Sequence, residues 1–411
     1  MLEIELAEKE EVKFFDEDED QEIESTATNR RSELDEIAGI IVSGTDWTTE
    51  TILNQLIREN IKLNPRFQRR DAWDLTRKSR FIESLILGFP IPQIVLATDE
   101  KERGKFIVLD GKQRLLTILQ FYGRSATPND AFSLRNLEFR PELNAQTYEG
   151  LQNNLLHSPE LDNLDNQTIR TTLIRNWHSE SFLYKIFYRL NVESTPLSPQ
   201  ELRQALHPGS FVNFLDDQSV NSQALRKILK SKNPDFRMRD VELLLRYVAF
   251  YYFLSEYRGN LKAFLDMTCK VLNKDWGRKS DDIKNTIDQF EKAVETTIDI
   301  FGEKNFSRMW LIKSKSYRPQ FNRAILDVMV FYFSDTIIRQ DAEKNKEAVE
   351  KAFKKLCASS EFRGSVEGTT KNIHETYTRL SLWGKALLEV LGAEFNVPKL
   401  VDNRIIFDGL R

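Results

Sequence analysis

Five consecutive residues, Asp110-Gly111-Lys112-Gln113-Arg114, combine the side chains that a phosphate-binding turn needs. They follow the apolar run 106–109 and precede a helical pattern at 115–121. This order predicts a strand that ends at a carboxylate, a turn at glycine and a helix with basic residues in its first turn. The unpaired N–H groups and the dipole at a helix start favour an anion, and a glycine there can take positive φ without obstructing a ligand.

The side chains of this stretch suggest distinct roles. Lys112 and Arg114 would supply positive charge, and a guanidinium can hold two phosphate oxygens at once. Asp110 could hold a hydrated metal ion or orient an attacking water. A plainer interpretation also fits, in which Asp110 caps the helix and both cations are solvated. The spacing alone does not decide between the two.

A second basic stretch lies upstream, at residues 64–73. Pro65 predicts an extended or turned backbone, and three arginines fall within five positions, with Phe67 and Trp73 as apolar anchors. Such a loop could form a cationic rim for phosphates. The alternative is a surface loop whose arginines form salt bridges.

Composition indicates a globular protein of two or three domains. The chain has 411 residues, of which 40% are hydrophobic and 30% charged. No run of apolar residues is long enough to span a bilayer, so we expect no membrane segment. The acidic N-terminus does not resemble a signal peptide.

Cysteine and histidine are too sparse for several kinds of site. The two cysteines lie 88 positions apart, which indicates neither a disulfide framework nor a zinc site and fits a reducing cytoplasm. None of the four histidines has metal-ligand spacing to another. We therefore do not expect a histidine-built metal centre or a Cys/His nucleophile pair. These residues are Cys269, Cys357, His157, His178, His207 and His374.

Charge is distributed unevenly along the chain. Residues 1–29 contain 12 acidic residues and two lysines, a net charge of −10. Because the whole chain has a net charge of −4, the remaining residues carry +6. We predict a disordered acidic tail, which would either keep the protein soluble or engage a basic partner. The mildly basic remainder could accept nucleic acid, although ordinary surface charge also explains it.

The first half of the chain mixes predicted helices and strands. Thr48 is a suitable N-cap for a helix whose apolar face is Ile52, Leu53, Leu56 and Ile57. Ser198 and Glu201 similarly mark the start of a helix that ends near 206. The other predicted elements are strands at 61–63, 93–97 and 105–109, helices at 79–87 and 112–123, a short element at 169–174, and either a strand or a helix at 181–190.

The second half is predicted to be mostly helical. Helical patterns cover 241–254, 260–273, 281–300, 319–339, 341–358 and 371–391. The polar basic stretches 276–280 and 313–318 read as connectors, and 404–407 as a short strand. The fold class is therefore α+β, with domains at 30–210 and 211–411 after the tail at 1–29.

Six ordered motifs give the chain a resemblance to a known family. Residues 45–300 resemble the N-terminal domain of GmrSD-type, modification-dependent restriction enzymes, which looks related to the ParB/sulfiredoxin fold. The motifs are Pro65–Arg69 followed by Trp73, Gly88–Pro92, Leu109–Leu115, Phe187–Asn191, Leu197–Leu202, and Arg239-Asp240 ahead of a helix.

The resemblance implies a fold and a site. The fold would be a small mixed sheet with helices, and the activity would be binding and hydrolysis of a nucleoside triphosphate at an Asp-Gly-Gln-Gln-Arg signature. Lys112 stands where the family usually has glutamine, which leaves hydrolysis open. The implied catalytic residues are Asp110, Gln113 and Arg114, and the implied phosphate-binding residues are Gln68, Arg69, Gly111, Lys112 and Asn191.

The resemblance also implies ligands and partners. Mg²⁺ would arrive with ATP, GTP or CTP, with Asp110 as its protein ligand, and the chain would act on or sense DNA, with or without modification. The family's C-terminal His-Asn-His nuclease domain has no counterpart motif here, so we expect a separate nuclease subunit. A homo-oligomer is also conceivable. The alternative function is a regulatory module that binds nucleotide or DNA without hydrolysis.

Overall fold

The computed structural model describes residues 39–63, 72–100, 102–125, 130–177, 182–183, 186, 198–367 and 372–410. Backbone contacts divide the chain into two compact units. The sheet unit holds the described residues of 39–206 together with 236–238, and the helical unit holds 207–235 and 239–410. The predicted acidic tail at 1–29 lies outside the described residues, as do most of 181–190.

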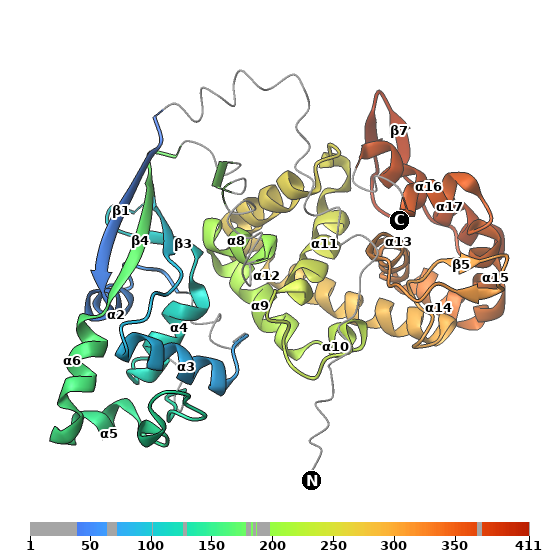
Figure 1. Ribbon diagram of the computed structural model, residues 1–411. Coiled ribbons are helices and arrows are strands. Elements are labelled where there is room, and N and C mark those ends of the chain that lie inside the picture. The colour runs from blue at the N-terminus through green and yellow to red at the C-terminus, as the bar shows by residue number, and fades with distance from the viewer. Residues whose placement is uncertain are drawn as a thin grey trace, which may run out of the picture. The chain divides into compact units, whose positions relative to one another are not determined.

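A four-stranded mixed sheet forms the centre of the sheet unit (Figure 1). Its order is β1-β4-β2-β3, in which β1 and β3 run antiparallel to their neighbours and β2 runs parallel to β4. The strands are β1 (Ile41–Thr48), β2 (Ile94–Thr98), β3 (Phe106–Asp110) and β4 (Thr168–Arg175).

Helices pack on both faces of this sheet, and β2 is buried on both sides. Ile94 and Leu96 of β2 face one core, whereas Val95 and Ala97 face the other, as the period of two along a strand requires. The first core is shared with helices α2 (Thr49–Ile57), α3 (Leu75–Ile86), α4 (Lys112–Phe121), α5 (Tyr148–Gln152) and α6 (Ser158–Asn166), and the second with α8 (Pro199–Leu206). Short 3-10 helices lie at Pro141–Leu143 and Leu155–His157.

Most local predictions for this unit are confirmed. The β2–β3 hairpin and the helix that follows it lie where the pattern placed them, and Thr48 caps α2 by accepting a hydrogen bond from the Thr51 N–H at 3.1 Å. Two predictions are wrong. The 61–63 strand is reduced to an isolated bridge from Ile61 to Phe106, and β1 was not anticipated. β1 is a largely exposed edge strand, so it lacks the apolar alternation that marks a half-buried strand.

The helical unit confirms the predicted helical second half (Figure 1). Its helices are α9 (Ser210–Asn221), α10 (Gln223–Leu229), α11 (Arg239–Phe253), α12 (Leu261–Phe301), α13 (Arg323–Phe333), α14 (Thr336–Lys344), α15 (Lys346–Leu356), α16 (Ser360–Glu367) and α17 (Ile373–Val390), with a 3-10 turn at Leu254–Glu256. Two hairpins complete it, β5 (Trp310–Leu311) with β6 (Ser316–Tyr317), and β7 (Lys399–Val401) with β8 (Arg404–Ile406).

Two helix boundaries differ from the sequence prediction. The expected connector at 276–280 lies inside α12, which is continuous over 41 residues. A single glycine there costs only about 1 kcal/mol, and Lys279 packs over the rings of Tyr252 and Phe253, so tertiary contacts hold the helix together. Conversely, the helix expected at 319–339 is divided, because the Asp335 side chain accepts from two N–H groups and starts α14.

Candidate phosphate-binding site

The turn between β3 and α4 has the backbone that the sequence predicts. Gly111 is the N-cap of α4 and has φ +97°, a left-handed conformation that side-chain-bearing residues rarely adopt. A Cβ atom at this position would lie 3.0 Å from Cγ1 of Ile94 and 3.3 Å from Nη2 of Arg114. Glycine is thus required at this buried position by both conformation and space.

The start of α4 differs from the starts of α2 and α3, and resembles that of α6, which also has no side-chain cap. α2 and α3 are capped by the side chains of Thr48 and Asp74, whereas Gly111 offers no side chain to cap α4. The Asp110 carboxylate does not cap α4 as the plainer interpretation required. The N–H groups of the first turn therefore receive no side-chain cap, which is the arrangement that accepts anionic oxygens at helix starts.

Arg114 is held rigidly beside this turn. Its Nη2 donates to Oδ2 of Asp110 at 2.7 Å and to the carbonyl oxygen of Gln93 at 2.9 Å. The residue is 7% exposed, so its charge is not solvated as the plainer interpretation supposed. Among the described residues its Nε is buried without a hydrogen-bond partner. Leaving a buried donor unpaired is costly, so this atom calls for an acceptor.

Lys112 lies in a different environment, although it is only two positions away. Its ammonium forms an ion pair with Glu201 of α8, and both side chains are 4% exposed. Glu201 also accepts from the N–H of Ser198 at 2.6 Å, while the Ser198 hydroxyl accepts from the N–H of Glu201, which makes a capping box. The carboxylate that starts α8 therefore also neutralises Lys112.

Gln113 is half-buried. Its Oε1 accepts a long hydrogen bond, 3.4 Å, from the N–H of Ala72. Ala72 is the first described residue after 64–71, the segment that contains Gln68 and Arg69. Gln68, Arg69 and Asn191 lie outside the described residues, so their roles stay predictions.

Sequence reasoning missed two residues of this site. Gln93 supplies the carbonyl that holds Arg114, and a main-chain acceptor leaves no signature in a sequence. Glu201 was recognised as a helix-start carboxylate, but its ion pair with Lys112 joins residues 89 positions apart. Only the packing of α8 against β3 brings them together.

The protein-family comparison agrees with this geometry. Residues 50–208 match the family described as "GmrSD restriction endonuclease, N-terminal domain". The chain carries a GmrSD N-terminal domain. The match spans the whole β3–α4 turn and both members of the Lys112–Glu201 pair. No curated protein and no solved structure matches the chain. The relation to the ParB/sulfiredoxin fold accordingly stays a prediction.

The GmrSD N-terminal domain indicates a component of a restriction system. In the described part of the chain, no helix is both long and apolar enough to cross a membrane. Within the same residues, no three His, Cys, Asp or Glu side chains gather in a metal-binding cluster. A metal ion that relied on Asp110 would therefore need most of its ligands from elsewhere.

Proposed function

We propose that the GmrSD N-terminal domain of this chain binds and hydrolyses a nucleoside triphosphate at the β3–α4 turn, as part of a restriction system that acts on or senses DNA. The observation that carries the proposal is the buried Nε of Arg114, which has no partner among the described residues, beside a helix start without a side-chain cap. The phosphates of a nucleotide would supply the acceptor that this donor lacks and would accept from the first-turn N–H groups.

Each residue of the turn then has a role that follows from its contacts. Arg114 is fixed by Asp110 and Gln93, so it is preorganised to neutralise charge on the phosphates without a cost of ordering at the moment of reaction. Gly111 lets the backbone approach the ligand. Lys112, already paired with Glu201, chiefly fastens α4 to α8 and contributes less charge to the ligand than the sequence suggests.

Magnesium fits this site as a companion of the nucleotide. Mg²⁺ commonly uses one or two carboxylates together with substrate phosphates and water. Asp110 is the carboxylate at the turn, and its side chain is 19% exposed. It would hold the ion directly or through water, and the ion would offset negative charge on the phosphates. Gln68, Arg69, Gln113 and Asn191 are proposed to complete the pocket.

The test is phosphate release from ATP, GTP and CTP with Mg²⁺, with and without modified DNA. We expect Asp110→Asn to abolish release and Arg114→Ala to lower kcat by about 10²–10³-fold, the usual loss when one preorganised donor is removed. Two control variants change the same residue types at exposed positions of the sheet unit. Asp162→Asn lies in α6 and Arg124→Ala lies just after α4, and both should leave phosphate release unchanged. Full activity in Asp110→Asn would refute the proposal.

A second function has one observation in its favour. Lys112 occupies the position where the family resemblance expects a glutamine, and its ammonium is held by Glu201. If that glutamine positions water, the domain would bind nucleotide as a switch without hydrolysis. Nucleotide that binds saturably, is recovered intact and no longer binds to Arg114→Ala would favour this alternative. In either case we propose that the chain works with a nuclease partner.

A further inference from the structure

The helical unit contains a strongly basic groove outside the family-matched region. Its volume is about 670 Å³, and it is open to solvent at one end of α10, where the chain after α12 joins it. Five cationic side chains line this groove and one carboxylate accompanies them. These residues are Arg226, Lys227, Lys230, Lys232, Lys304 and Glu303.

Helix-dipole effects explain only part of this charge. Arg226 and Lys227 lie in the last turn of α10, where cations complement the partial negative charge of the helix end. Lys232 lies beyond the helix, and Lys304 comes from a segment more than 70 positions away. All four lysines are exposed, and within the described residues none of them forms an ion pair with a carboxylate. Their charges repel one another in the free protein and are therefore available to a negative ligand.

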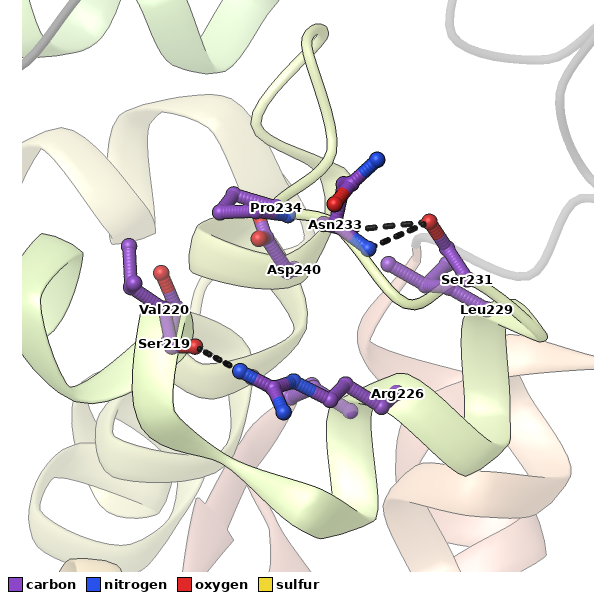
Figure 2. A pocket seen from close by; sticks show the side chains of 9 residues that line it. Ser219, Val220, Arg226, Leu229, Ser231, Asn233, Pro234 and Asp240 are labelled. Atoms are coloured by element: carbon purple, nitrogen blue, oxygen red, sulfur yellow. Dashed lines mark hydrogen bonds between the residues drawn. The ribbon is translucent and has the colours of Figure 1, made fainter. Parts of the chain in front are cut away.

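Specific hydrogen bonds order the backbone next to the groove, and Figure 2 shows them in a neighbouring pocket that shares Arg226 and Ser231 with the groove. Arg226 donates from Nη2 to the carbonyl oxygen of Val220 at 2.9 Å. Lys230 caps α10 in the left-handed region, with φ +49°, and its N–H donates to the Arg226 carbonyl. The Ser231 hydroxyl donates to the Asn233 carbonyl at 2.9 Å and accepts from the Asn233 N–H at 3.2 Å. Lys230 and Lys232 thus belong to a turn whose backbone is held by hydrogen bonds.

A ligand for this groove must carry several negative charges along an extended chain. A single small anion would leave most of the cations unpaired. A nucleic acid strand carries one charge about every 3.4 Å, and each lysine or arginine that neutralises a phosphate releases condensed counterions into solution, which favours binding. We propose that this groove binds the phosphate backbone of DNA. The choice of DNA among polyanions rests on the proposed function of the chain in a restriction system.

The test measures binding of a fluorescent DNA duplex to the full chain across a series of salt concentrations. The variant Lys227→Gln/Lys230→Gln/Lys232→Gln removes three charges but keeps side-chain length. The control Lys351→Gln/Lys355→Gln/Lys385→Gln removes three charges from exposed positions of α15 and α17 in the same unit. We expect the groove variant to bind DNA at least tenfold more weakly. The slope of the logarithm of the binding constant against the logarithm of the salt concentration should be less steep by about two to three, because each lost phosphate contact lowers its magnitude by about 0.9. The control variant should behave as the wild type.

Two outcomes would overturn the groove assignment. One is equal binding and equal salt dependence in the groove and control variants. The other is displacement of DNA by polyaspartate of matched charge as effectively as by unlabelled duplex, which would make the groove a site for acidic peptides. Phosphate release measured without DNA separates this proposal from the proposed function, because the groove variant should release phosphate as the wild type does. If the wild type hydrolyses no nucleotide but the groove variant still loses DNA binding, only the proposed hydrolysis is refuted.

Discussion

The buried ion pair between Lys112 and Glu201 gives the sharpest prediction about the sheet unit. Both side chains are 4% exposed, so neither charge has water to stabilise it in place of its partner. Lys112→Met removes one charge and keeps an unbranched side chain of similar length. It leaves the Glu201 carboxylate buried and without this cation.

The expected cost follows from that environment. Breaking a buried pair by removing one partner costs about 3–5 kcal/mol, mostly because the remaining charge is uncompensated. For a unit of this size, each 1 kcal/mol lowers Tm by about 2–4 °C, so the variant should lose about 6–20 °C. Lys62 pairs with Asp99 and Glu102 with 31% of its side chain exposed, and Lys62→Met should cost at most about 1 kcal/mol.

A double variant identifies the cause of the loss. Glu201→Gln removes the remaining charge and keeps an oxygen that can accept from the Ser198 N–H, so Lys112→Met/Glu201→Gln should recover most of the lost stability. Because the chain has two units, hydrogen exchange on peptides from α4 and α8 reports the sheet unit by itself. If Lys112→Met is as stable as Lys62→Met, or if the double variant is less stable than the single one, the argument for a buried, mutually neutralising pair is refuted.

Three further predictions concern single positions. Gly111→Ala should destabilise the sheet unit by about 1–2 kcal/mol in urea unfolding, because alanine is strained at φ +97° and its Cβ meets Ile94; unchanged stability would contradict the observed turn. Gly384→Ala should destabilise the helical unit by about 1–3 kcal/mol, because the new Cβ would collide with the hydroxyl of the buried Tyr332. This collision outweighs alanine's better helix propensity, and a gain in Tm would show instead that Tyr332 can move aside. Burial raises the pKa of Cys357 to about 12, so its thiol stays protonated through neutral and mildly alkaline pH and a thiol reagent should modify it only after unfolding; rapid labelling of the native protein would contradict this.

Short-range signals in the sequence were enough to locate the candidate turn. The apolar run before Asp110, the glycine and the helical pattern after it all depend on neighbouring residues, and the resulting β3–Gly111–α4 turn is confirmed. The N-cap at Thr48 and the capping box at Ser198 are equally local, because the side chain and the N–H that it binds lie within three positions. The α+β class follows from the same signals, since strands and helices have different apolar periods.

Tertiary structure decided the features that depend on distant partners. β1 is an exposed edge strand that is held by its pairing with β4, so its own residues carry little apolar pattern. The unbroken α12 depends on packing that offsets its central glycine. At the site, the sequence identified Arg114 and Lys112 as two similar cations. Folding distinguishes them. Arg114 pairs with Asp110 at the turn itself and keeps an Nε donor that has no partner among the described residues, whereas Lys112 pairs with Glu201 of the distant helix α8.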